Sequence, residues 1–543
     1  MAQAPPALPS GAVLQAGSAT ISTPSAGALT VSQSSDRAVI DWSSFSIGEG
    51  GAVVFENGAG ATLNRVTGGD RSSIDGLLSA TGSVYLLNPS GVIIGKSGVV
   101  NVGGGFVAST LDASNDAFMS GGALRLTGAS GASVINLGKI GALGGDVVLA
   151  AYTVANAGAV SAPEGDIGLL AGQSVRLRDQ ALNNGKFAVD VVSPGSTVTN
   201  SGDLRAAMVE LKANGGNVYA LAGNTGDAIS ATGVSNHDGK VFLIAEGGAL
   251  TARGEITARG GGDGPGFVET SGAAVDFSGV RIDTGGGDWL VDPYNLAVDT
   301  AAAATISANL ATTNVTLQTT ASGATGPGVV SPGGQGDISI DAGISWSSAN
   351  RLTLDAYHGI TVNAPIVASG AGKVTLTTNN GGAGGKLAFA LSPTLGFTGG
   401  LSFSGAANSG QDLIINGQAY SLIYSTTDLL NVNNSPNGRY ALARTIDAAG
   451  LFATNRNIIV NTFGGSFNGL GNSISNLKLE NYNFNLPNFA YRQIGLFQNV
   501  TNTGSVSALG VTNATILITF YGPHSDCVQG GVLAGINDGS LVG

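Results

Sequence analysis

Few residue types in this chain could carry catalytic or metal chemistry. Its three histidines, His237, His358 and His524, lie far apart in the sequence, and each stands beside Gly, Asp or Pro in a turn-like setting. A histidine-based catalytic triad and a histidine-rich zinc site are therefore not expected. The single cysteine, Cys527, follows His524 within the unusual segment Tyr521–Cys527, but one Cys and one His supply too few ligands for a metal ion.

Clustered carboxylates would instead indicate polysaccharide cleavage, which needs acids gathered on one face. Asp283, Asp288 and Asp292 are close in the sequence, but they flank a Gly-Gly-Gly turn and a strand around Trp289, as turn aspartates do. The glycine-rich run 260–264 lacks the Lys-Ser/Thr pair of a phosphate loop, and no calcium-binding nonapeptide recurs in tandem. The sequence thus predicts no enzyme, no metal and no cofactor.

Composition indicates how the remaining residues are used. The chain has 87 Gly in 543 residues, 11% charged residues and 6% aromatic residues, so it is too apolar for disorder and too rich in turn formers for helices. We expect an all-β protein. A solenoid would reconcile this with the length, because each repeat packs only on its neighbours and no globular core has to grow.

Charge and hydropathy exclude several kinds of partner. The net charge is −12 with only 23 Lys and Arg, so there is no basic stripe for nucleic acid or anionic lipid. No run of about 18 apolar residues exists, so we expect no membrane insertion. A single cysteine excludes an intramolecular disulfide, and stability must come from stacked strands and buried aliphatic side chains.

An internal repeat predicts the architecture. A 20-residue period with short β runs between Gly, Asn and Asp is typical of a right-handed parallel β-helix, in which alternate aliphatic residues face the bore. We expect Asn136 and Asn156 to stack as an internal ladder. Over about 450 residues, at about 4.8 Å per coil, such a rod would be on the order of 100 Å long. The repeating positions are Asn136, Gly138, Ile140, Ala142, Gly145, Asp146, Val147 and Leu149, which recur as Asn156, Gly158, Val160, Ala162, Gly165, Asp166, Ile167 and Leu169.

One stretch carries a family resemblance. Residues Val84–Thr110 are short β-branched runs cut by an Asn-Pro turn and several Gly turns. They resemble the secretion domain of the large exoproteins exported by two-partner secretion, the filamentous-haemagglutinin family. Arg37–Gly48 is similar to the first core strands of that domain, and Leu63–Gly69 to the segment before its signature turn. The likeness covers roughly residues 10–115.

The resemblance implies a partner and a candidate site. An outer-membrane transporter of the two-partner type would hold the unfolded secretion domain, and folding at the cell surface would help to draw the chain outward. Asn88, Pro89 and Gly91 would form the signature turn, with Asn101 on the following strand, and Ser90 stands where the family usually has a second Asn. The open alternative is that these four residues are structural corners only.

The chain is expected to comprise four regions. Its start, Met1–Pro6, is interpreted as a mature N-terminus with an added Met, and the whole as a fragment of something longer. The regions are a secretion domain (1–118), a β-helix (119–300), a continued β-helix or β-rich extension (301–445), and repeats that resemble the bacterial GLUG repeat (446–543).

These inferences leave three classes of function for a secreted, cell-surface protein. A surface adhesin or structural rod is favoured, with an unidentified receptor on a host or neighbouring cell, because a long rod without a catalytic cluster presents a surface and little else. A binding protein for a host carrier or a haem source is the alternative. A β-helical polysaccharide-degrading enzyme comes third.

Overall fold

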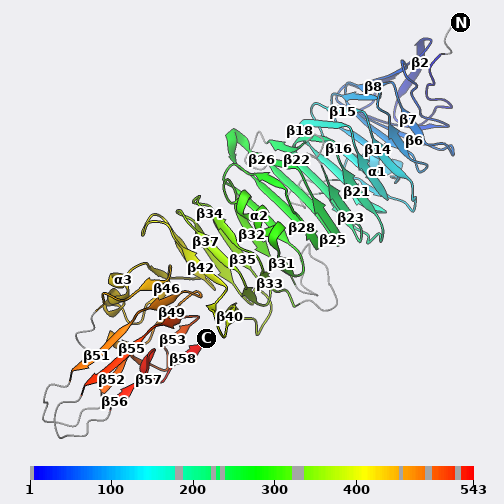
Figure 1. Cartoon of the computed structure of the whole chain (residues 1–543). Coiled ribbons are helices and arrows are strands. Elements are labelled where there is room, and N and C mark those ends of the chain that lie inside the picture. Colours follow the sequence, from blue (N-terminus) through cyan, green and yellow to red (C-terminus); the bar gives the residue numbers. More distant parts are fainter. Residues whose placement is uncertain are drawn as a thin grey trace. The chain divides into compact units, whose positions relative to one another are not determined.

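The structure is a computed structural model, shown in Figure 1. His237, His524 and Cys527 lie outside the residues that it describes, so the expectations for their chemistry stay predictions. The chain divides into two compact units, which are treated separately below: Met1–Asn295 with Thr312–Gln335, and Leu296–Ala311 with Gly336–Gly543. The described residues are 5–177, 187–221, 228–232, 239–320, 335–451, 457–482, 492–519 and 528–542.

The first unit is a parallel β-helix, which confirms the expected all-β fold class. Its strands stack in parallel in three rows, one for each face of the coil (Figure 1). The first row contains β7 (Ser72–Ile74), β10 (Val92–Ile94), β14 (Ser133–Asn136), β17 (Thr153–Asn156), β21 (Thr197–Asn200) and β23 (Asn217–Ala220).

The second row carries the outward-facing position that matters for the candidate site. It contains β3 (Ala28–Gln33), β5 (Ala52–Glu56), β8 (Leu77–Ala80), β11 (Val99–Val102), β15 (Lys139–Ala142), the first halves of β18 (Ala159–Ala171) and β22 (Asp203–Asn214), β24 (Ala228–Thr232), β26 (Glu255–Gly260) and β29 (Arg281–Asp283).

The third row carries the buried Trp42, Phe106 and Trp289. It contains β4 (Arg37–Trp42), β6 (Ala61–Val66), β9 (Ser83–Leu87), β12 (Phe106–Ser109), β16 (Val147–Ala151), the second halves of β18 and β22, then β25 (Lys240–Ala252), β28 (Phe267–Asp276), β30 (Asp288–Asp292) and β32 (Asn314–Gln318).

The 20-residue repeat found in the sequence is one coil of this helix. Val147 pairs with Ile167 in the third row, and Asn136 pairs with Asn156 in the first. Val147 and Ile167 are fully buried, as expected for alternate residues that face the bore. The predicted register is therefore confirmed.

The asparagine ladder is also present, and it has a further rung. The side-chain amide of Asn136 donates to Oδ1 of Asn156 (2.7 Å), and that of Asn156 donates to Oδ1 of Asn200 (2.7 Å). All three side chains are buried. Sequence reasoning missed Asn200 because it follows Asn156 by 44 residues rather than 20.

Glycines form a column at the corner that follows the ladder. A Cβ at Gly158 would lie 2.1 Å from the carbonyl oxygen of Gly138, and one at Gly202 would lie 2.0 Å from that of Gly158. Successive coils approach each other here so closely that any side chain would push them apart. The repeated glycine is therefore a packing requirement.

Other elements cover the end and one outer face of the first unit. Strands β1 (Val13–Ala16) and β2 (Ala19–Ser25) pair antiparallel with β4 and β3. Helix α1 (Asn115–Ser120) and the antiparallel sheet of β13 (Arg125–Thr127), β19 (Ser174–Arg176) and β20 (Ala188–Val189) contribute to a second apolar layer. This layer contains the outward-facing Leu87, Val107, Val148 and Leu170 of the third row together with Phe118, Leu126 and Val175.

The second unit is also built from parallel strand rows. Its helix α2 (Thr300–Asn309) begins at the side-chain cap of Asp299. The rows are β31 (Leu296–Val298), β33 (Ile338–Ile340), β36 (Ile360–Val362) and β39 (Leu387–Phe389); β34 (Ile344–Trp346), β37 (Pro365–Ala368) and β42 (Gly400–Phe403); and β35 (Arg351–Asp355), β38 (Lys373–Thr377) and β43 (Asp412–Ile415).

Towards the C-terminus the same stacking continues with longer coils, and the likeness of 446–543 to GLUG repeats stays a prediction. The stacked strands here include β45 (Ser421–Ile423), β46 (Arg439–Leu442), β49 (Ser466–Asn468), β53 (Ser505–Ser507) and β58 (Ser540–Val542).

Candidate functional site

The Asn-Pro segment forms a β-turn between β9 and β10. The Gly91 N–H donates to the carbonyl oxygen of Asn88 (2.9 Å), which closes the four-residue turn. The Ser90 N–H donates to Oδ1 of Asn88 (2.8 Å). Pro89 supplies the fixed φ that suits the second position, and Gly91 takes a φ of 109°, which favours glycine.

Asn88 anchors this turn inside the protein. Its side chain is 0% exposed, and its amide donates to the carbonyl oxygen of Asp70 (2.9 Å) and to Oγ of Ser72 (3.0 Å). Its backbone N–H donates to the carbonyl oxygen of Ser109 in the next coil (2.9 Å). In the folded state this side chain is a structural group that no partner can reach.

Pro89 is the part of the turn that faces outward. It is exposed, and Ser90 is half-buried. The hydroxyl of Ser130 donates to the carbonyl oxygen of Pro89 (2.6 Å), which fixes the turn against the following coil. A partner of the folded protein would therefore meet the Pro89 ring and the Ser90 side chain.

The structure does not bring Asn101 together with the turn. Asn101 lies on β11 in the second row, where it is exposed and stands in register between Ser79 and Gly141. Its neighbour Val99 is also exposed and pairs with the exposed Leu77. The four predicted site residues thus form a turn and a separate surface position on another face of the coil.

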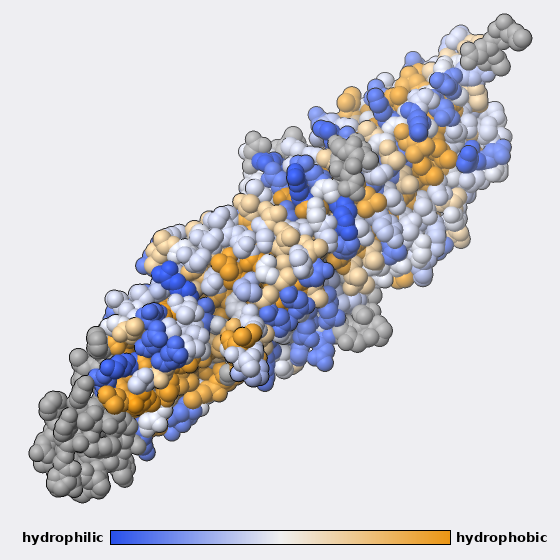
Figure 2. All heavy atoms as spheres, in the orientation of Figure 1, coloured by the Kyte–Doolittle hydropathy of each residue, from blue (hydrophilic) through white to orange (hydrophobic). Residues whose placement is uncertain are grey.

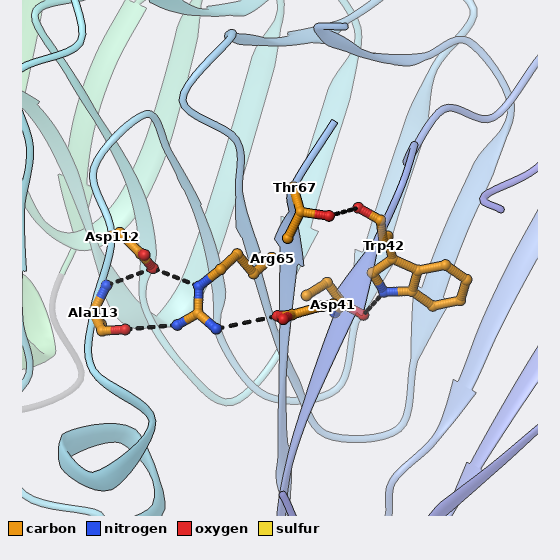
Figure 3. Close-up of polar contacts among 7 residues, drawn as sticks. Asp41, Trp42, Arg65, Thr67, Asp112 and Ala113 are labelled. Atoms are coloured by element: carbon orange, nitrogen blue, oxygen red, sulfur yellow. Dashed lines mark hydrogen bonds and ion pairs between the residues drawn. The ribbon is translucent and has the colours of Figure 1, made fainter. Parts of the chain in front are cut away.

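Arg65, whose side chain is largely buried, forms a set of contacts that sequence reasoning missed. Arg65 donates through Nη1 to Asp41 (3.1 Å), through Nε to Asp112 (2.9 Å) and through Nη2 to the carbonyl oxygen of Ala113 (2.7 Å) (Figure 3). Burial lowers the pKa of the Arg65 guanidinium, but the hydrogen bonds and charges of Asp112 and Asp41 outweigh this and raise its pKa above the ordinary value. Arg65 therefore fastens the segment before α1 to strands β4 and β6.

The neighbouring motif residues serve packing. The indole N–H of Trp42 donates to Oδ1 of Asn64 inside the bore (3.0 Å), and its ring meets that of Phe45 edge-on at 5.4 Å. Thr67 donates through Oγ1 to the carbonyl oxygen of Trp42 (3.1 Å), next to the Arg65 contacts (Figure 3). The sequence did carry a signal for these contacts, because Asn64 and Arg65 stand side by side in the otherwise mainly apolar strand β6.

The aspartates considered for catalysis are held by separate partners. Asp283 pairs with Arg259 (2.5 Å), and Asp288 accepts from the amide of Asn314 (3.1 Å). Asp292 is buried and accepts from the hydroxyl of Thr320 (3.3 Å). These contacts are those of turn and strand-end residues.

Other chemistry is equally sparse within the described ranges. His358 contacts Oδ1 of Asp337 through Nδ1 (2.6 Å). In that part of the chain no group of three or more His, Cys, Asp or Glu side chains is arranged to hold a metal ion. The helices seen there are all too short or too polar to cross a membrane.

The part of the chain that contains these residues is similar to known proteins. Residues 7–258 match the model of the TPS secretion domain family. A heme/hemopexin-binding protein of Haemophilus influenzae strain Rd is 35% identical over 263 residues, which are 46% of this chain and 28% of that protein. Another heme/hemopexin-binding protein of Haemophilus influenzae is 47% identical over 98 residues, 18% of this chain and 10% of that protein. The chain therefore matches less than a third of either relative.

A solved structure shows the same fold. The crystal structure of the HMW1 secretion domain from Haemophilus influenzae superposes with a TM-score of 0.50 at 22% identity, over 75% of this chain and all of that one. The family match extends from residue 7, before β1, to residue 258 in β26. The division into a secretion domain (1–118), a β-helix (119–300) and the two later regions stays a prediction.

Proposed function

We propose that the chain, whose residues 7–258 match the TPS secretion domain family, is a two-partner secretion exoprotein and that its outer-membrane transporter recognises the Asn88–Gly91 turn. The exposed Pro89 at a corner with a fixed conformation supports this role. Asn101 is proposed as a second, separate contact, because it is exposed on β11.

Burial determines whether the transporter could bind each of these residues in the folded or only in the unfolded state. The Asn88 side chain has no exposed surface in the folded domain, so a transporter could bind it only before the coil closes. Pro89 is accessible in both states. Recognition of an unfolded domain is consistent with slow formation of parallel pairs between coils.

The experiment separates recognition from folding. Asn88→Ala would remove three side-chain hydrogen bonds and cost about 1–3 kcal/mol of stability by itself, so its effect on secretion is ambiguous. Pro89→Ala and Asn101→Ala change exposed side chains, and we expect lower secretion from cells that carry the transporter, with nearly unchanged melting temperatures. Ser161→Ala, exposed on β18, is the matched control. Wild-type secretion of both variants would reject the recognition role.

For the exported protein, we propose two functions in order of preference. The first is binding of a host haem carrier, and the second is that of a surface adhesin or structural rod. The names of the two relatives, both heme/hemopexin-binding proteins, favour this order. The test is capture of haem-loaded hemopexin by the purified chain, with serum albumin as control. Failure there, together with binding to whole cells or glycan arrays, would favour the adhesin, and polysaccharide depolymerisation would indicate the enzyme.

A further inference from the structure

One corner of the second unit carries an insertion that the coil does not need. Residues 341–343 join β33 to β34, and residues 363–364 join β36 to β37. The next coil makes the same corner, between β39 and β42, with the ten residues Ala390–Gly399. These residues form a hairpin of β40 (Leu391–Ser392) and β41 (Gly396–Phe397), of which β40 is labelled in Figure 1.

The hairpin exposes apolar side chains at its tip. Leu395 is 79% exposed and Leu391 is 57% exposed. Pro393 between them is also exposed. Figure 2 shows hydrophobic surface at the place that Figure 1 labels β40. Leu391 and Leu395 thus form a small apolar tip on an insertion that the coil does not need, and this tip is free to contact something outside the protein.

The tip is uncharged and its backbone donors are largely satisfied. The nearest charged residues along the chain are Lys386 and Asp412. The N–H groups of Thr394 and Leu395 donate to Oγ of Ser392 (3.3 Å each), and Pro393 has no N–H. At the base, the Thr398 N–H donates to the carbonyl oxygen of Ala390 (2.9 Å).

These features fit a lipid surface better than a protein. The interfacial layer of a bilayer accepts apolar side chains from a segment without charge, it hydrates polar backbone groups at headgroup depth, and it needs no complementary shape. A stable protein interface takes about 20–30 residues from each partner, more than the ten residues of this hairpin. The net charge of −12 disfavours anionic lipids.

We propose that the hairpin Ala390–Gly399 is a lipid-contacting tip that inserts Leu391 and Leu395 into the interfacial layer of a zwitterionic bilayer. The contact is peripheral and differs from a membrane-spanning segment. It revises the expectation from the sequence that the chain makes no membrane insertion. It lies outside residues 7–258 and does not depend on the secretion role.

The first test is co-sedimentation of the full chain with phosphatidylcholine vesicles. We expect weak, reversible binding that added NaCl does not reduce, since no charge takes part. Leu391→Ser and Leu395→Ser should each lower the partition coefficient about tenfold. Leu143→Ser, at a 62% exposed leucine of the first unit, is the matched control and should bind like the wild type.

A second measurement locates the contact. The native Trp42, Trp289 and Trp346 are buried, so a tryptophan at the tip can be observed against a constant background. The emission of Leu395→Trp should shift to the blue with vesicles and be quenched by brominated acyl chains, and that of Leu143→Trp should not. Absence of vesicle binding by the wild type, or equal behaviour of the tip and control variants, would overturn the proposal.

Discussion

Asn156 links three neighbouring coils of the first unit through one side chain. It accepts from Asn136 and donates to Asn200, and all of these groups are buried. Loss of Asn156 leaves the amide donor of Asn136 and the acceptor Oδ1 of Asn200 without their ladder partners. Asn136 and Asn200 at the ends each have a single ladder partner. The strength of the ladder therefore depends most on its centre.

Asn156→Ala should lower the free energy of unfolding by about 3 kcal/mol, because two buried polar groups lose their partners at about 1–3 kcal/mol each. Urea denaturation measures this. Asn101→Ala, at an exposed position, should change it by less than about 0.5 kcal/mol. Equal stability of the two variants would show that the ladder contributes nothing.

A surface carboxylate gives the stability a defined dependence on pH. The hydrogen bond from Arg253, with further bonds from Ser278, lowers the pKa of Asp276 to about 2, against the opposing effect of burial. Because the folded pKa is depressed, the stabilisation is present above the ordinary value of 3.8 and is lost as the pH falls towards about 2.

The wild type should therefore exceed Asp276→Asn in unfolding free energy at pH 6, and the difference should vanish near pH 2. The difference should stay below about 1 kcal/mol, since this pair is open to solvent and salt. Urea titrations at several pH values measure it. A difference that does not change with pH would contradict the assignment to this ion pair.

At the scale of the element, strand β18 contains both environments of the coil. Ile167 points into the bore and is fully buried, whereas Ser161 on the same strand is exposed. The register of β18 shifts between Ala162 and Asp166, so that the even-numbered Val160 and Ala162 face the bore before this corner and the odd-numbered Ile167 faces it afterwards. The contrast between Ser161 and Ile167 therefore tests the register on both sides of the corner.

Ile167→Asp should destabilise the protein by more than about 4 kcal/mol or prevent folding, since it buries an unpaired charge, and Val147→Asp in the preceding coil should do the same. Ser161→Asp should leave the melting temperature nearly unchanged. Thermal melts followed by circular dichroism compare the three. A mild effect at Ile167 would mean that its side chain does not face a packed bore.

At the scale of the whole molecule, the contacts are made between coils. Val154 pairs with Val198, and Leu204 pairs with Ile229, so each strand must close a long loop before burial stabilises it. Folding dominated by such non-local pairs is slow. Slow folding would keep the matched region, residues 7–258, available to the proposed transporter.

Refolding from urea should therefore take about a second or longer. Fluorescence of the buried Trp42 and Trp289 reports it for the first unit. The rate should be the same with and without a thiol reductant, since the chain has one cysteine and no intramolecular disulfide to form. Complete refolding within milliseconds would contradict a rate set by pairing between coils.

The sequence by itself determined the local pattern of this protein. The 20-residue repeat predicted the coil, the alternation of Val147 and its neighbours, and the stacking of Asn136 on Asn156. The motifs around Trp42 and Asn88 indicated the secretion domain. These features are readable because strand alternation and corner glycines recur at fixed short spacings.

Only the tertiary structure decided which distant residues meet. It buried Asn88, left Pro89 outside, and placed Asn101 on another face of the coil. It also joined Arg65 to Asp112, added Asn200 to the ladder, and left the tip around Leu395 in solvent. Irregular insertions shift the spacing between coils, and contacts across such insertions follow from how coils stack in space, which no short sequence period encodes.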